Sequence, residues 1–204
     1  MKKIFLLSIP VLFAVINLNC SAYKTIVNTS GLKFRLKKVN NLTLAGIYLK
    51  NKSSVNDFSS LDLLKMTVSY AKKEMPISFN LIVEVLNPNN GTGGYPKTNV
   101  IITSFPWRLM IDNKEIETGN IKSPITVPGK AGKTDFSINI NFNLYKLFQY
   151  EGYHSLINFA LNLKGFGNSL PKLILYAKPG LSTSLKDLSY PHELKIISLG
   201  GGIK

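Results

Sequence analysis

The sequence predicts an all-β protein, an antiparallel β-sandwich of immunoglobulin-like or fibronectin III-like topology with one to three short helices. Most of the chain alternates apolar and polar residues with the period of a half-buried strand, and turn residues separate the alternating runs. Three short segments break this alternation and favour helices. An apolar run at the N-terminus sets the first residues apart from the domain.

That N-terminal segment has the layout of a secretory signal peptide. Lys2 and Lys3 precede an apolar run over residues 4–16, which is too short to cross a bilayer. Cys20 is the only cysteine of the 204-residue chain and lies four residues after the run. This is where a bacterial lipoprotein is lipidated and cleaved, so the sequence predicts lipidation of Cys20.

Cleavage at the A-x-A-like site ending at Ala22 is the alternative, and it would release a soluble periplasmic or secreted protein. Either way we expect an exported protein, and with lipidation a lipoprotein anchored in a membrane of the bacterial cell envelope. We assign residues 1–19 to the signal peptide and residues 20–31 to an N-terminal tether. With one cysteine there is no intramolecular disulfide, so the hydrophobic core must supply the stability.

The chain is strongly basic, with a formal net charge of +14 that falls to +12 when Lys2 and Lys3 are removed with the signal peptide. Only Arg35 and Arg108 are arginines, so the bidentate grip on phosphates and guanines is nearly absent, and we expect no nucleic-acid partner. The lysines are scattered, which is typical of a solvated surface. Weak attraction to an anionic lipid surface is the partner that this charge allows.

The clearest strand covers residues 77–85, where every odd position is apolar. Trp107, Leu109 and Ile111 alternate in the same way and are expected in the sandwich core. Asp112 and Asn113 follow, and because both residue types tolerate positive φ they predict a tight hairpin. Further strands are predicted at residues 32–39, 42–49, 136–142, 170–177 and 193–199.

Residues 59–74 favour a helix, because Leu61, Leu64, Val68 and Ala71 recur at helical spacing. The alternation of apolar residues over 64–70 also fits a strand and leaves the pattern ambiguous. A serine that can cap the start and a proline that can end the segment support the helix. Residues 144–150 and 155–163 are predicted to form short helices between strands.

The strand over residues 77–85 runs directly into Asn87, Pro88 and Asn89. Pro88 cannot donate a ladder hydrogen bond, and the two asparagine side chains can bond nearby backbone groups, so this junction ends strand pairing without any ligand. A cation or sugar site built from these asparagines and Asn90 is the alternative. No carboxylate lies nearby to support it, so we expect no metal and no cofactor.

Several stretches together resemble the late embryogenesis abundant type 2 (LEA type 2) family, the WHy domain. They are Met75-Pro76 before the strand, Asn87-Pro88-Asn89 after it, Phe105-Pro106-Trp107, Ile111-Asp112-Asn113, "ITVPGKAGKTDFSINI" from residue 125 and "LPKLILYAKPG" from residue 170. The resemblance covers roughly residues 32–199 and leaves residues 200–204 as a flexible tail. Asn113 stands where glycine is commoner, and residues 90–96 make a longer loop than usual.

The resemblance implies a non-enzymatic β-sandwich, often a lipoprotein in exported bacterial members. Its role would be protective or interaction-based, in desiccation or another stress response, with an unidentified protein partner. One alternative is a module that binds lipid or another apolar ligand in a groove between the sandwich and the helix at Ser59. An envelope hydrolase using His154 or His192 is the least favoured, because neither histidine has a metal-ligand or triad pattern and no catalytic residue is indicated. Glu115 and Glu117, two apart on a strand, are expected to share one solvated face.

Overall fold

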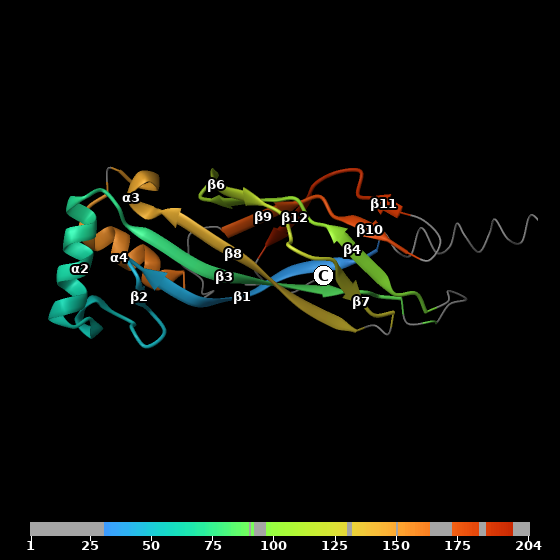
Figure 1. The fold of residues 1–204 in the computed structure, drawn as a ribbon, viewed down its shortest axis with the longest axis horizontal. Helices are drawn as coiled ribbons and strands as arrows, with labels where there is room; N and C mark the ends of the chain where they lie inside the picture. The colour runs from blue at the N-terminus through green and yellow to red at the C-terminus, as the bar shows by residue number, and fades with distance from the viewer. Residues whose placement is uncertain are drawn as a thin grey trace, which may run out of the picture.

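The computed structural model describes residues 31–89, 91, 97–129, 132–149, 151–163, 173–183 and 187–197. Antiparallel strands form two facing layers, and a group of short helices lies at one end of an elongated body (Figure 1). The predicted all-β sandwich with a few short helices is therefore confirmed. Among the described residues, no helix is both long and apolar enough to cross a membrane.

The first layer is a continuous sheet in the order β2-β1-β3-β8. Its strands are β1 (Lys33–Leu44), β2 (Ile47–Tyr48), β3 (Pro76–Leu86) and β8 (Lys133–Asn143). Strands β3 and β8 pair without a register shift along their whole length. The separate strands predicted at residues 32–39 and 42–49 are wrong: one long strand bends past Asn41, which has a φ of 52°, and a turn at Ala45 and Gly46 leads into β2.

The second layer is broken into two sheets, ordered β11-β10-β4-β7 and β12-β9-β5-β6. Each chain segment that passes from one sheet to the other carries a proline at the break, namely Pro106, Pro124, Pro179 or Pro191. Proline interrupts pairing because it has no N–H to donate. The strands are β4 (Val100–Ser104), β5 (Trp107–Ile111), β6 (Lys114–Gly119), β7 (Ile125–Val127), β9 (Leu173–Ala177), β10 (Gly180–Ser182), β11 (Asp187–Ser189) and β12 (Leu194–Ile197).

Backbone hydrogen bonds cross the breaks and hold the two sheets in line. The Lys178 amide donates to the Pro106 carbonyl at 3.0 Å, and the Tyr190 amide donates to the Pro179 carbonyl at 3.1 Å. Strands β5 and β6 are joined by the predicted hairpin, in which Asp112 and Asn113 have φ values of 47° and 66°. That prediction is confirmed, and the asparagine replaces the commoner glycine at a positive φ.

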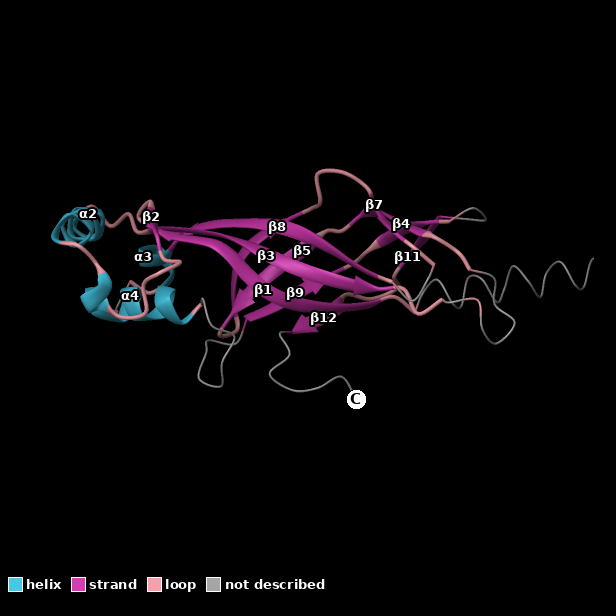
Figure 2. Cartoon of the chain, turned by 90° about the horizontal axis from the view of Figure 1, so that it is seen from below, coloured by secondary structure: helices cyan, strands magenta, loops and turns pink. Residues whose placement is uncertain are grey.

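The helices η1 (Val55–Asp57), α2 (Ser60–Ala71), α3 (Leu144–Leu147) and α4 (Tyr153–Asn162) gather beyond one end of the strands (Figures 1 and 2). The predicted helix after Ser59 is confirmed, as is the cap: the Asp62 amide donates to Ser59 Oγ at 3.1 Å, and the Ser59 amide donates to the Asp62 carboxylate at 3.2 Å. The Tyr153 hydroxyl donates to the Leu63 carbonyl at 3.3 Å and ties α4 to α2.

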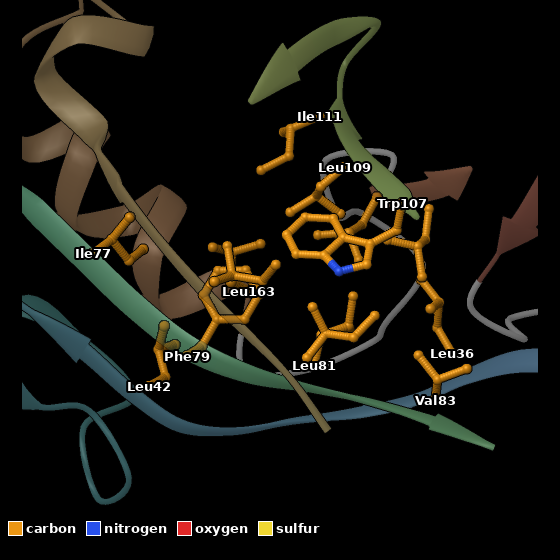
Figure 3. Close-up of a cluster of buried hydrophobic side chains, with 14 of the residues drawn as sticks. Leu36, Leu42, Ile77, Phe79, Leu81, Val83, Trp107, Leu109, Ile111 and Leu163 are labelled. Atoms are coloured by element: carbon orange, nitrogen blue, oxygen red, sulfur yellow. The ribbon is translucent and has the colours of Figure 1, made fainter. Parts of the chain in front are cut away.

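The core lies between the two layers and is filled by side chains of both (Figure 3). Phe79 and Leu81 of β3 face Trp107, Leu109 and Ile111 of β5, and each of the five is buried. The prediction that the alternating positions of β5 fill the core is confirmed. Burial of these side chains, without a disulfide, supplies the main stabilising free energy of the domain.

Candidate functional site

The predicted site residues fall in different parts of the molecule. Cys20, the predicted lipidation site, lies outside the described residues. Asn87, Pro88 and Asn89 follow β3 at the end of the body opposite the helices (Figure 1). Strand β1 begins at the same end, because Lys33 pairs with Leu86.

The Asn87 side chain is fully buried and all of its hydrogen-bonding groups are engaged. Its Nδ2 donates to the Thr98 carbonyl at 3.0 Å and to the Val127 carbonyl at 3.4 Å. Its Oδ1 accepts from the Asn89 amide at 3.1 Å, which makes an Asx turn around Pro88. One amide side chain therefore links the end of β3 to two segments of the second layer.

A close backbone approach completes this junction. Gly129 packs so tightly that a Cβ there would lie 2.5 Å from the Thr98 carbonyl oxygen, and its amide donates to Asn99 Oδ1 at 2.9 Å. Backbone packing therefore requires a glycine at position 129, and the Asn99 side chain satisfies its amide. The geometry accounts for Asn87, Pro88 and Asn89 as a clamp between the layers.

The same residues offer little to a cation. The Asn87 amide is committed to backbone groups, and Asn90 lies outside the described residues. Within the part of the chain that is described, no group of three or more histidine, cysteine, aspartate or glutamate side chains could hold a metal. The contacts of Asn87 have a structural role that needs no ligand.

A buried tyrosine fixes the chain where it enters the domain. The Tyr190 hydroxyl donates to the Leu32 carbonyl at 3.4 Å, and its ring packs against Phe34 with 6.4 Å between centroids. Burial raises the pKa of Tyr190 to about 12, so the hydroxyl keeps its proton and remains a donor. Leu32, which precedes β1, is thereby held at the junction end.

A charged pair lies in the first layer, two residues from the junction end of β3. Glu84 of β3 is 4% exposed, and its carboxylate contacts the Arg35 guanidinium at 2.6 Å and 2.8 Å. The Arg35 hydrogen bond holds the pKa of Glu84 below its ordinary value, and Lys133 and Lys37 add to the effect. Because Arg35 and Glu84 are cross-strand partners, this pair fixes the register of β1 against β3.

The residues considered for hydrolysis do not assemble. His154 lies on α4 and His192 lies in the turn before β12, and both are exposed. Among the described residues neither histidine is hydrogen-bonded to a serine and a carboxylate. Glu115 and Glu117 do not share a face, because a register shift in β6 pairs Glu115 with Met110 and Glu117 with the buried Leu109. Burial raises the pKa of Glu117 above its ordinary value.

Shallow hollows are found at the surface, with volumes of 360, 440 and 460 Å³. The two larger of these are lined by strand and loop residues, and the smallest by residues of α4 and of the segment between α3 and α4. No residue of α2 lines any of the three, and α2 lies beyond the ends of the strands (Figures 1 and 2). The apolar groove considered between the sandwich and this helix therefore has no support from these hollows.

The surface that sequence reasoning missed is the outer side of α2. Leu61 and Leu64 are each 60% exposed and Val68 is 45% exposed, while Met66 on the same helix is completely buried. Lys65 and Lys72 lie four residues after Leu61 and Val68, on the same side, and both are exposed. We call Leu61, Leu64, Lys65, Val68 and Lys72 the α2 face. The spacing of its three apolar residues was visible in the sequence, but spacing alone does not indicate exposure.

Comparison with known proteins yields no protein-family model that matches the chain. No curated protein matches it either. Solved structures with distant similarity include a protein from Archaeoglobus fulgidus, 13% identical, with a TM-score of 0.32 over 60% of this chain and 86% of that one. A structural genomics target is 8% identical with a TM-score of 0.37, covering 84% of this chain and 90% of its own. A protein from Bordetella pertussis is 8% identical with a TM-score of 0.34, covering 83% of this chain and 95% of its own. None of the three informs the function of this chain.

Proposed function

We propose that this protein is a non-enzymatic interaction module of the bacterial cell envelope, of the LEA type 2 kind, tethered to a membrane through a lipid on Cys20. One observation carries the proposal: the chain enters the domain at one end of an elongated body, and exposed apolar side chains lie on a helix at the other end (Figure 1). A tether at Leu32 would hold the α2 face away from the anchoring membrane, where it can meet a partner.

The packing supports a binding role over a carrier or catalytic role. Buried side chains fill the space between the layers, which leaves little room there for a carried ligand. Among the described residues, neither His154 nor His192 is joined to a serine and a carboxylate. Large exposed apolar side chains gathered on one helix face are, in contrast, typical of contact surfaces. In the proposed role, the module protects the envelope by holding such a contact during desiccation or a related stress.

Intact mass spectrometry of the mature protein from the membranes of its host tests the tether. We expect a diacylglyceryl mass on Cys20 that is absent from a Cys20→Ser variant. A lipid-free chain beginning at Tyr23 would contradict the tether and make the protein a soluble exported one. Survival after drying tests the role: we expect the full-length gene to restore survival to a deletion strain, and the Cys20→Ser gene to fail.

A further inference from the structure

Helix α2 carries apolar side chains on two sides, and only one of these sides is covered. Met66 is completely buried, and Leu63 and Tyr70 pack against the hydrophobic core. The Tyr70 ring meets the rings of Tyr145 and Tyr153 with centroid distances of 5.3 Å and 5.6 Å. The inner side therefore suffices to dock the helix, and the outer side with Leu61, Leu64 and Val68 has no role in the packing.

The charges around the outer side are positive. Lys65 and Lys72 flank the apolar residues, and Lys73 follows directly. Asp62 is the one carboxylate within α2, and its charge is neutralised by Lys52 at 3.0 Å and by the helix cap. The nearest other acids in sequence are Asp57 and Glu74, which lie three residues before and three residues after the helix. A helix with an apolar stripe bordered by lysines is the pattern that lies in the interface of anionic membranes.

A second copy of the chain fits this surface poorly. A symmetric contact through the α2 face would bring Lys65 and Lys72 toward the same lysines of the partner, in a protein whose net charge is already +12 without Lys2 and Lys3. Like charges at a contact oppose association. The partner that satisfies both the apolar stripe and the lysines is apolar in its interior and negative at its surface.

We propose that the α2 face binds the surface of an anionic lipid bilayer. Leu61, Leu64 and Val68 enter the boundary between headgroups and acyl chains, and Lys65 and Lys72 contact lipid phosphates. This names the partner of the proposed interaction module as a bilayer other than the one that holds the tether, and it rests on that proposed function for the placement of the α2 face away from the anchor. The helix lies along the surface, since 12 residues are too few to span a bilayer.

A fluorescent probe on the α2 face tests the contact directly. The test uses the mature protein as the host makes it, with Leu64→Cys labelled by a polarity-sensitive fluorophore. The native Cys20 is either lipidated or lost with the signal peptide under the two expected routes of processing, so position 64 is the one reactive thiol. Ile197→Cys, on β12 and 48% exposed, is the matched control. Vesicles of phosphatidylcholine are added with or without phosphatidylglycerol.

We expect the probe at position 64 to shift to the blue and brighten several-fold with phosphatidylglycerol vesicles only, and the probe at 197 to stay unchanged. Lys65→Glu combined with Lys72→Glu should weaken the response at least about tenfold, since each lysine near an anionic surface contributes roughly fivefold. Lys97→Glu combined with Lys195→Glu, at exposed positions outside α2, should leave most of the response. Added salt should reduce it.

Three outcomes would overturn the proposal. An equal response to phosphatidylcholine alone would remove the role of charge, and the absence of any response would remove the membrane contact. A blue shift without vesicles that grows with protein concentration would show that a second copy covers the α2 face. Each outcome is distinguishable from failure of the tether, because the mass of Cys20 is measured separately and the vesicles are added to either processed form.

Discussion

The two ends of the molecule are built on opposite principles. At the junction end, polar side chains are buried: Asn87 is completely inside, and the Tyr190 hydroxyl is buried against the Leu32 carbonyl. At the helical end, Leu61, Leu64 and Val68 stand in solvent. Burying a polar group is favourable only when its hydrogen bonds are satisfied, and leaving apolar groups in water forgoes stability.

This difference between the two ends distinguishes residues that stabilise the fold from residues that are available for contact with a partner. The buried polar groups at the junction end bond to other parts of the chain, so the fold itself accounts for them. The apolar groups on the outer side of α2 contribute little to folding, so a contact outside the domain is the better account of them. Substitutions at the junction should therefore act on stability, and substitutions on the α2 face should act on binding.

The largest effect on stability is expected at the junction. Asn87→Ala removes the side-chain amide. The Thr98 and Val127 carbonyls lose the hydrogen bonds that Nδ2 donates to them, and the Asn89 amide loses the one that it donates to Oδ1. We expect a loss of about 3 kcal/mol in the free energy of unfolding. For a domain of this size the melting temperature should fall by about 10 °C. Thermal unfolding followed by circular dichroism measures it.

Asn139→Ala is the matched control for that substitution. Asn139 is exposed on β8 and donates to Asn80 Oδ1 at 3.1 Å, so water can replace the lost partner. Asn139→Ala should lower the free energy of unfolding by no more than about 0.5 kcal/mol. Equal losses for the two asparagine variants would mean that Asn87 is not a clamp, and the account of the junction end would have to be abandoned.

Sequence patterns predicted the core strands because those strands have one buried face. The alternation over residues 77–85 and 107–111 matches the buried positions of β3 and β5. The broken second layer was harder to predict, because β7, β10 and β11 are each three residues long and show no period. The shared face of Glu115 and Glu117 was lost to a register shift, which depends on pairing with β5 and not on the spacing within β6.

The candidate surface marks a different limit of sequence reasoning. Leu61, Leu64 and Val68 correctly predicted a helix, because helical spacing does not depend on what covers the helix. Met66 and Tyr70 form a second apolar side of the same helix, and sequence alone could not say which side packs. The answer depends on where α3 and α4 lie, which is set by contacts far apart in the chain.

Glu84 and Arg35, close to the junction end, should give an intermediate effect that depends on pH. The pKa of Glu84 is lower in the folded protein than in the unfolded chain, so its contribution is complete above about pH 4.3 and is lost as the pH falls through the folded pKa. Glu84→Gln should cost about 1.5 kcal/mol near neutral pH. The loss in free energy of unfolding should be smaller in acid. Urea unfolding of the native protein and the variant at neutral and at acidic pH measures the difference.

The smallest effect is expected on the α2 face, and it is the most informative. Leu64→Ala should change the free energy of unfolding by less than about 0.5 kcal/mol, because the side chain is 60% exposed. Met66→Ala, two residues away on the same helix, should cost about 3 kcal/mol because that side chain is completely buried. Urea unfolding of both variants measures the contrast, and alanine preserves helix propensity in each. Similar losses at the two positions would mean that another part of the chain covers Leu64 in solution. A contact outside the domain would then be unnecessary, and the helical end would differ from the junction end only in the chemistry of what it buries.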